Sequence, residues 1–245
     1  MELRAIQSCL RAGIRSRAAA VGPFLALLNT TSDSPFLNYA VPVDNSAPNP
    51  ADVAELVAFF TGHDRQPRLE YVRPAPRVDE PLLAAGFDVT PTLTLMALGE
   101  FTPVGDVPGY RVHPTEDGAE LRQAVAVQNT AYGEPDPTND VLGLPGIVRA
   151  GGCVAVAVDP SGDVVGSGLW PSPKEGLVEV LGIGVLPAHR GRGLARSLAS
   201  VLTDAALRQG DQPFLQVADD EPERIYERLG YRVIGAMADA RLTVR

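Results

Sequence analysis

The sequence predicts an α/β fold in which helices flank a mixed sheet, and two observations lead to this prediction. In the C-terminal half, short apolar runs with the period of strands alternate with longer segments that have the period of helices. A stretch rich in Pro and Gly, residues 101–109, separates this region from an N-terminal half with similar periodicity. A length of 245 residues is compatible with two domains, each able to bury a core.

The N-terminal half is predicted to begin with a helix. Apolar residues recur at helical spacing at Leu3, Ile6, Leu10 and Ile14. The intervening arginines and the short apolar runs favour an amphipathic helix over a targeting peptide. The other elements expected in this half are a hairpin over residues 22–29 and 35–42, a helix over 51–61, a short strand after Pro67 and a helix that ends at Gly86.

The C-terminal half is predicted to alternate between strands and helices. The turn-forming residues 160–163 join two apolar runs into a hairpin, and Gly230 is typical of a residue that ends a helix. The expected strands are residues 110–113, 153–158, 164–169, 177–185, 214–217, 231–234 and 241–244. The expected helices are residues 116–131, 139–150, 191–207 and 222–229.

The two halves share a short pattern. A proline enters a strand in each half, and the helix that follows ends with a glycine and an aromatic residue, at Gly86-Phe87 and at Gly230-Tyr231. This indicates a duplication, although short similarities also arise by chance between units built from a helix, a strand and a helix. We place the boundary at residue 103, which gives domains 1–103 and 104–245.

The composition argues against several classes of function. A formal net charge of −9 disfavours nucleic acid as a partner and would attract a cationic amine, although it also simply keeps a protein soluble. No apolar run approaches the ~20 residues that span a bilayer, so we expect no membrane partner. Cys9 and Cys153 lie far apart and the histidines are scattered, which indicates free thiols in the cytoplasm and no metal site.

The most informative stretch is a glycine-rich turn between a strand and a helix. Gly191 and Gly193 lack side chains, so the backbone can curl closely around a ligand. The amides from Arg192 to Arg196 begin the helix without partners inside it, which favours an anion. Arg190, Arg192 and Arg196 add positive charge, and guanidinium suits phosphate. These residues predict a diphosphate ligand, although such a turn by itself need only begin a helix.

The same residues resemble the signature of the GNAT family of N-acetyltransferases, Arg/Gln-x-x-Gly-x-Gly/Ala, which stands here as Arg190-Gly191-Arg192-Gly193-Leu194-Ala195. The approach at residues 185–190 and the later stretches 215–217 and 222–231 also resemble family motifs. The resemblance covers residues 110–245 and implies the GNAT fold, an α/β (α+β) arrangement with a mixed, mostly antiparallel central sheet. Together with the duplication, it implies a degenerate GNAT-like domain followed by an intact one.

The resemblance implies that acetyl-CoA is the co-substrate, with its diphosphate on the Arg190–Ala195 loop. The pantetheine arm would then run like an added strand beside the strand that ends at Val185, bonded to backbone groups of Ile183 and Val185. Gly182 and Gly184 agree with this, since glycine inside an apolar strand often marks a bulge or a close backbone approach. The alternative is that these glycines only admit a bulky neighbour.

The resemblance also implies two catalytic side chains. Tyr226 matches the family tyrosine that commonly protonates the departing thiolate, and a phenol with its usual pKa near 10 would do so at little cost. The ring could instead only pack over the sulfur. Glu179 stands eleven residues before Arg190 (190 − 179), where several family members carry a glutamate that acts as the base for the amine. If its side chain instead points to solvent, Glu179 is only a polar residue of the strand.

Two features depart from the family pattern. Asp219 and Asp220 stand where the second motif often has an asparagine, and a carboxylate cannot donate a hydrogen bond as an amide does. In the N-terminal half, residues 44–50 replace the phosphate loop, and Pro48 and Pro50 remove two amide donors. We expect this half not to bind CoA and to form either a wall of the substrate cleft or a homodimer surface.

The predicted function is transfer of an acetyl group from acetyl-CoA to a primary amine, by direct attack in a ternary complex. The alternative is a non-catalytic protein that binds or senses CoA. The acceptor, a small molecule or a protein amine, is expected at variable loops. These are residues 132–144, which carry Glu134, Asp136 and Asp140, and residues 170–176.

Overall fold

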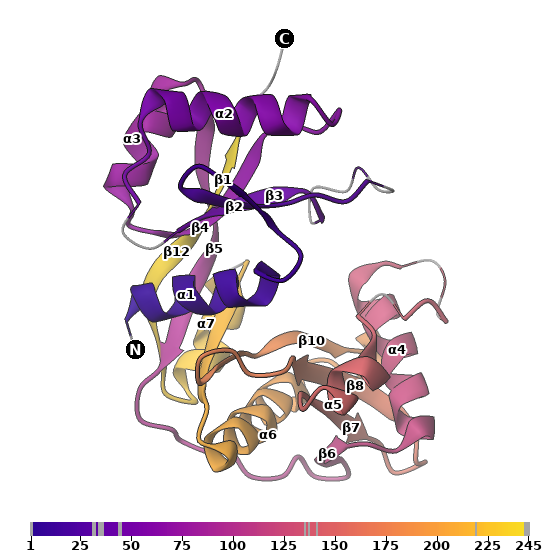
Figure 1. Ribbon diagram of the computed structural model, residues 1–245. Coiled ribbons are helices and arrows are strands. Elements are labelled where there is room, and N and C mark those ends of the chain that lie inside the picture. The colour runs from indigo at the N-terminus through magenta and orange to yellow at the C-terminus, as the bar shows by residue number, and fades with distance from the viewer. Residues whose placement is uncertain are drawn as a thin grey trace. The chain divides into compact units, whose positions relative to one another are not determined.

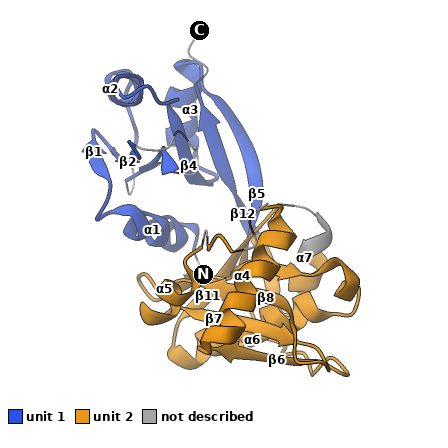
Figure 2. Cartoon of the chain, turned by 90° about the vertical axis from the view of Figure 1, so that its right-hand side faces the viewer, with its two compact units in different colours: residues 1–95, 234–245 blue, residues 96–233 orange. Residues whose placement is uncertain are grey.

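The computed structural model describes residues 2–30, 33, 37–43, 46–134, 136, 138–140, 142–218 and 220–242. The chain divides into two compact units, of which unit 1 comprises Met1–Leu95 with Ile234–Arg245, and unit 2 comprises Met96–Val233 (Figure 2). The C-terminal segment therefore belongs to the same unit as the N-terminal half. A single boundary at residue 103 does not anticipate this return of the chain.

Unit 1 is a mixed sheet with helices on both of its sides. Its helices are α1 (Leu3–Ile14), α2 (Pro50–Thr61) and α3 (Pro76–Ala84), and its strands are β1 (Ala19–Val21), β2 (Phe24–Leu27), β3 (Tyr39–Pro42), β4 (Arg68–Arg73) and most of β5 (Asp88–Leu98) and β12 (Tyr231–Arg241). The strand order is β1-β2-β3-β4-β12-β5, parallel between β3 and β4. Figures 1 and 2 show β1–β3 between α1 and α2.

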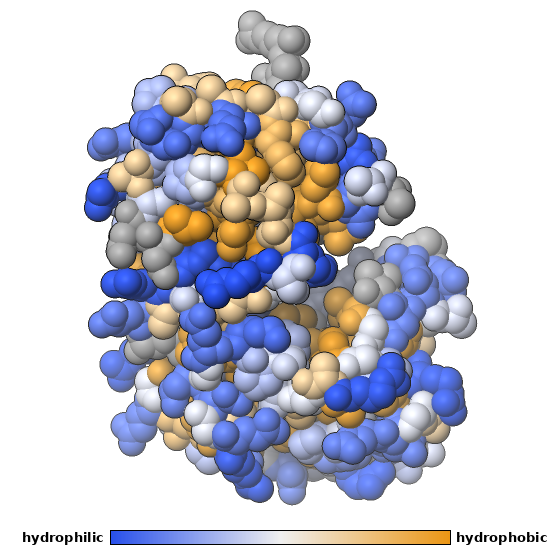
Figure 3. Space-filling model, viewed as in Figure 1, coloured by the Kyte–Doolittle hydropathy of each residue, from blue (hydrophilic) through white to orange (hydrophobic). Residues whose placement is uncertain are grey.

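The helices of unit 1 form where the sequence gives them one apolar face. α1 buries Ile6, Cys9 and Ile14, and Figure 3 shows hydrophilic residues along the outer side of this helix. Strands β4 and β12 are joined by a buried ion pair in which Arg68 Nε lies 3.0 Å from Asp239 Oδ1. Arg68 also pairs with Glu70, and Asp239 also pairs with Arg241, so four charges form one network that links β4 to β12.

Unit 2 contains a four-stranded antiparallel sheet and a parallel pair of strands. The first has the order β10 (Leu181–Val185), β8 (Val164–Trp170), β7 (Cys153–Val158), β6 (Arg111–Thr115), and the second pairs β9 (Leu177–Glu179) with β11 (Gln212–Val217). The helices are α4 (Gly118–Tyr132), α5 (Leu144–Arg149), α6 (Leu194–Gln209) and α7 (Asp220–Glu227). The core includes Trp170, which is fully buried and donates from Nε1 to Leu202 O at 3.0 Å.

Two strand predictions need correction. The expected strand over residues 177–185 is broken at Val180, and its two parts, β9 and β10, lie in different sheets. The expected strands 231–234 and 241–244 are one strand, β12, which ends at Arg241, and residues 243–245 lie outside the described part. Gly182 has φ +64°, a conformation that side chains disfavour, and it marks the irregular pairing between β10 and β8.

The two units repeat one order of elements. In unit 1, β1, β2 and β3 precede α2, β4, α3 and β5. From residue 153 onward, β7, β8 and β9–β10 precede α6, β11, α7 and β12, and β12 then continues into unit 1. In both, a helix connects two parallel strands, β3 with β4 and β9 with β11. This agrees with the duplication that the sequence indicates.

Two general properties of the described residues bear on function. None of their helices is both long and apolar enough to cross a membrane. Among the same residues, no cluster of three or more His, Cys, Asp or Glu side chains is arranged to hold a metal ion.

Candidate cofactor-binding site

Unit 2 contains a cleft of about 1160 Å³ between β10, the loop before α6, the first turn of α6, and parts of α4 and α7. All ten residues predicted to contact the cofactor line it, namely Ile183, Gly184, Val185, Arg190, Gly191, Arg192, Gly193, Leu194, Ala195 and Arg196. The structure thus brings the strand and loop parts of the predicted site together in one space. Their contacts with a cofactor remain a prediction.

The cleft exists because β9 and β10 separate. β9 pairs with β11, and Val180 N still donates to Phe214 O at 2.9 Å, but β10 pairs only with β8 and is an edge strand. Leu186 N bonds to Val165 O on the β8 side. Because bonding alternates along an antiparallel strand, the backbone groups of Val185 point to the open edge. Accordingly, Val185 O accepts from Arg190 Nε at 2.9 Å.

The loop before α6 presents a row of unpaired amides. Gly191 and Gly193 have φ +73° and +88°, and a side chain at either position would meet no atom within 4 Å. Ser197 N is the first amide of α6 with a partner inside the helix, Gly193 O at 3.0 Å. Among the described residues, nothing accepts from the amides of 191–196. Such amides at the positive end of a helix form a site for an anion.

Arginine supplies the charge of this cleft. Lining residues include Arg190, Arg192, Arg196, Arg224 and Arg228, and the described lining residues include no Asp or Glu. This local excess stands out in a chain with a net charge of −9, and it would draw an anionic ligand to the loop. Our sequence reasoning missed Arg224 and Arg228 as sources of charge, although their spacing of four on one helix could have indicated a shared face.

Both glycines of β10 have a structural reason. Gly182 adopts its positive φ beside Gln128, whose Nε2 donates to Ser167 Oγ at 2.7 Å and also to Gly182 O. At Gly184, a side chain would lie 2.7 Å from Ala131 Cβ on α4. Gly182 therefore forms the bulge, and Gly184 leaves room for the neighbouring helix α4. The sequence interpretation of a bulge holds at Gly182, and that of a glycine that admits a neighbour holds at Gly184.

We expect Gln128→Leu to destabilise the protein by about 1–3 kcal/mol and to weaken acetyl-CoA binding. The substitution leaves Ser167 and the Gly182 carbonyl without their partner, and the bulge that shapes the edge of β10 loses its anchor. Urea unfolding and calorimetric titration measure the two effects. Gln123→Leu is the control, because Gln123 on the same helix bonds Val164 N, away from the bulge. Equal loss of cofactor affinity in both variants would contradict this role.

Tyr226 lies on α7 beside the cleft, but it is not among the lining residues, whereas its neighbour Ile225 is. Its ring packs against the core of unit 2, 6.3 Å from that of Tyr231. Burial, with a smaller contribution from Tyr132, raises the pKa of Tyr226 to about 12. Proton donation to a thiolate is therefore costlier than the ordinary phenol pKa suggests.

Glu179 is the last residue of β9, paired with Phe214 and half-buried, and it does not line the cleft described above. Its role as a base stays a prediction. Of the two aspartates that depart from the family motif, Asp219 lies outside the described residues, and Asp220 begins α7.

In unit 1, the first amides of the equivalent helix, α2, are already hydrogen-bonded to a side chain of the protein itself. Asn49 Oδ1 accepts from Ala51 N at 2.8 Å and Asp52 N at 3.1 Å, and Asp52 Oδ2 accepts from Asn49 N. Pro50 supplies no amide. These bonds satisfy the donors that a phosphate would need, which agrees with the expectation that this half does not bind CoA. Asp44, in the loop before it, lies outside the described residues.

The loops expected to hold the acceptor are only partly as predicted. Asp136 Oδ1 accepts from Thr138 N and Oγ1, and Asp140 Oδ1 accepts from Leu144 N, so both carboxylates shape their own loop. Trp170, at the start of the second loop, belongs to β8 and is buried in the core. It is therefore unavailable to an acceptor, contrary to the expectation for residues 170–176.

Comparisons with known proteins agree with this fold. A family model described as FR47-like protein matches residues 173–241. A GCN5-related N-acetyltransferase from Kribbella flavida is 25% identical, with a TM-score of 0.79 over 99% of this chain and 96% of its own. A putative GNAT acetyltransferase from Novosphingobium aromaticivorans is 20% identical, with a TM-score of 0.60 over 98% and 99%.

A tandem GNAT protein from the clavulanic acid biosynthesis pathway is 13% identical, with a TM-score of 0.63 over 99% of this chain and 95% of its own. No curated protein sequence matches the chain. The family model and the solved structures confirm the predicted resemblance to the GNAT family and the mixed α/β fold of a tandem GNAT protein. This resemblance indicates acyltransferase activity.

Proposed function

We propose that the protein transfers an acetyl group from acetyl-CoA to a primary amine. The observation that carries the proposal is the row of unpaired amides at residues 191–196, set among arginines at the end of an open strand edge. A diphosphate suits these amides, and an amide-containing chain suits the backbone of Val185, which faces the open strand edge and whose carbonyl Arg190 Nε would have to release. The residues present therefore fit both halves of CoA.

In the proposed reaction, the neutral amine attacks the thioester carbonyl directly. The new C–N bond forms as the C–S bond breaks, the nitrogen loses a proton to Glu179 through a water, and the sulfur gains one. Tyr226 is the proposed donor of the second proton. With a pKa of about 12 against ~8.5 for a thiol, full proton transfer is uphill by roughly 5 kcal/mol. We therefore expect proton donation by Tyr226 to raise the rate by no more than the smallest factors typical of general acid catalysis.

We expect Tyr226→Phe to lower kcat by about 10- to 100-fold while leaving acetyl-CoA affinity within about twofold. Steady-state kinetics with a panel of primary amines measures the first effect, and calorimetric titration measures the second. Tyr231→Phe is the control, because it removes a neighbouring buried hydroxyl that bonds Thr203. An unchanged kcat in Tyr226→Phe would reduce this ring to a packing role.

The pH profile gives a further check on Tyr226. The raised pKa keeps the Tyr226 phenol protonated, and able to donate a proton, up to about pH 12. Deprotonation of Tyr226 therefore lies above the pH range in which the enzyme would be assayed. An alkaline decline of kcat near pH 8–10 in the native protein must then come from another group. Persistence of that decline in Tyr226→Phe would support this assignment.

A non-catalytic CoA-binding protein is the second candidate. It is favoured by the positions of Tyr226 and Glu179, neither of which is among the residues that line the cleft. Titration with acetyl-CoA alone does not separate the two candidates, but turnover does. Tight binding of acetyl-CoA with no acetylation of any amine in the panel would support the second candidate and overturn the first.

A further inference from the structure

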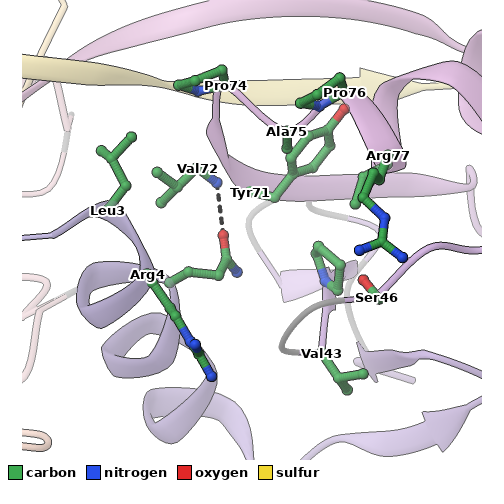
Figure 4. A pocket seen from close by; sticks show the side chains of 13 residues that line it. Leu3, Arg4, Val43, Ser46, Tyr71, Val72, Pro74, Ala75, Pro76 and Arg77 are labelled. Atoms are coloured by element: carbon green, nitrogen blue, oxygen red, sulfur yellow. Dashed lines mark hydrogen bonds between the residues drawn. The ribbon is translucent and has the colours of Figure 1, made fainter.

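Unit 1 contains a cavity of about 330 Å³ that the proposed acetyl transfer does not use. It lies between α1, the end of β3, β4 and the segment from Pro74 to Val78 (Figure 4). Its volume is at the lower end of the range for small-molecule sites.

The cavity forms where β3 and β4 separate. They pair at Ala40 and Leu69, after which β3 ends at Pro42 while β4 continues to Arg73. This parallels the separation of strands that opens the cleft of unit 2. Here, however, a side chain of α1 fills part of the opening, because Gln7 Oε1 accepts from Val72 N at 2.7 Å (Figure 4).

Two polar side-chain atoms of the residues that line this cavity have no hydrogen-bond partner among the described residues. The bond from Val72 N fixes the oxygen of the Gln7 amide, since the reverse orientation would oppose two N–H groups. Gln7 Nε2 is thereby left as a buried donor without a hydrogen bond, and Ser46 Oγ is buried without one as well. Each such group costs about 1–3 kcal/mol, so two at one cavity point to a ligand that satisfies them.

The described charged residues that line the cavity are both arginines. Arg4 on α1 and Arg77 on α3 line it, and neither forms an ion pair with a described residue. In Figure 4, the guanidinium of Arg77 is turned toward the side where Ser46 lies. The nearby acid Asp79 is already engaged, because it accepts from Tyr71 Oη at 2.6 Å and pairs with Arg73 Nη2 at 2.7 Å.

The rest of the wall is apolar, with prolines, valines and Leu3. We infer that this cavity binds a small organic carboxylate with a hydrocarbon body. The carboxylate pairs with the Arg77 guanidinium, and the hydrocarbon contacts the apolar wall. Gln7 Nε2 and Ser46 Oγ are buried just beneath the cavity surface, and a small shift of their side chains brings them to the carboxylate. CoA itself does not suit the site, since the capping box at Asn49 satisfies the amides that its diphosphate would need.

Ligand-observed NMR with the full chain tests this inference, with hexanoate as the probe and hexanol as its uncharged counterpart. We expect hexanoate to bind and hexanol to bind at least about tenfold more weakly. Arg77→Glu should weaken hexanoate about tenfold or more. Arg17→Glu makes the same charge change at an exposed residue of unit 1 away from the cavity, and it should leave binding within about twofold.

A second variant keeps the test independent of charge. Ser46→Leu fills part of the cavity and removes the unpartnered hydroxyl, so it should abolish hexanoate binding while the melting temperature, followed by circular dichroism, is retained. Saturating acetyl-CoA should not displace hexanoate. Displacement would assign the binding to unit 2 and overturn the inference. No binding of hexanoate, or equal binding of hexanol, would also overturn it, because water would then suffice for the two polar atoms.

Discussion

We expect Arg192→Glu combined with Gly193→Asp to lower acetyl-CoA affinity by about 1000-fold, roughly 4 kcal/mol. The two carboxylates would stand beside the unpaired amides of residues 191–196 and repel the diphosphate that these amides suit. Loss of two hydrogen bonds to a charged group, at about 1.5–3 kcal/mol each, accounts for the magnitude. Calorimetric titration of the native and variant proteins measures the change.

The same helix supplies a matched control. Arg208→Glu with Gly210→Asp makes an equal change of charge at the other end of α6, and Gly210 has φ +86° where Gly193 has +88°. Both double variants thus carry similar backbone strain. We expect the control to bind acetyl-CoA within about threefold of the native protein. If both variants lost binding equally, the cause would be damage to α6, and the loop would not be the cofactor site.

The second large effect is expected at Gly230, which the sequence predicts to end a helix over residues 222–229, and which in the structure lies in the turn after α7, three residues beyond its end at Glu227. It has φ +98°, and a methyl group there would lie 1.8 Å from Glu100 O. The backbone beyond Leu98 is held against it, since Gly99 N donates to Gly230 O at 2.9 Å and Thr102 N to Leu229 O at 3.0 Å. Gly230→Ala must therefore displace main chain, and we expect a loss of stability of at least about 4 kcal/mol.

Gly210→Ala isolates the contribution of the clash. Its φ of +86° imposes similar strain, but a methyl group there meets no atom within 4 Å, so we expect a loss of only about 1 kcal/mol. Trp170 is the single tryptophan and is buried in unit 2, so its fluorescence during urea unfolding follows the relevant unit. Similar midpoints for the two variants would show that the backbone at Glu100 yields easily.

Much of unit 2 could be predicted from local pattern. The strand over residues 153–158 and the helix after the glycine turn follow from periodicity and chain punctuation, which are properties of neighbouring residues. The loop at Arg190 was identifiable because a phosphate site built from backbone amides leaves glycines at fixed places. All ten predicted cofactor residues line one cleft because they come from two short neighbouring segments, residues 183–185 and 190–196.

Other features depend on partners that are distant in the sequence. The break at Val180 arises because β9 and β10 pair with different strands. The apolar pattern of a segment does not indicate which strands it will pair with. The bond from Val72 to Gln7 joins residues 65 positions apart. Likewise, the raised pKa of Tyr226 comes from burial, which a sequence match to a catalytic tyrosine does not contain.

The position of β12 has a consequence for biosynthesis. β12 follows the other strands of unit 1 in the sequence, and its residues from Ile234 onward lie between β4 and β5 in the sheet of that unit. A nascent chain therefore exposes an incomplete sheet until residues 234–241 have been synthesised, at about 5–20 residues per second. A stalled ribosome, or a premature stop codon shortly before residue 234, would leave β4 and β5 without the strand that lies between them. The exposed edges of these strands would then be accessible to chaperones or proteases.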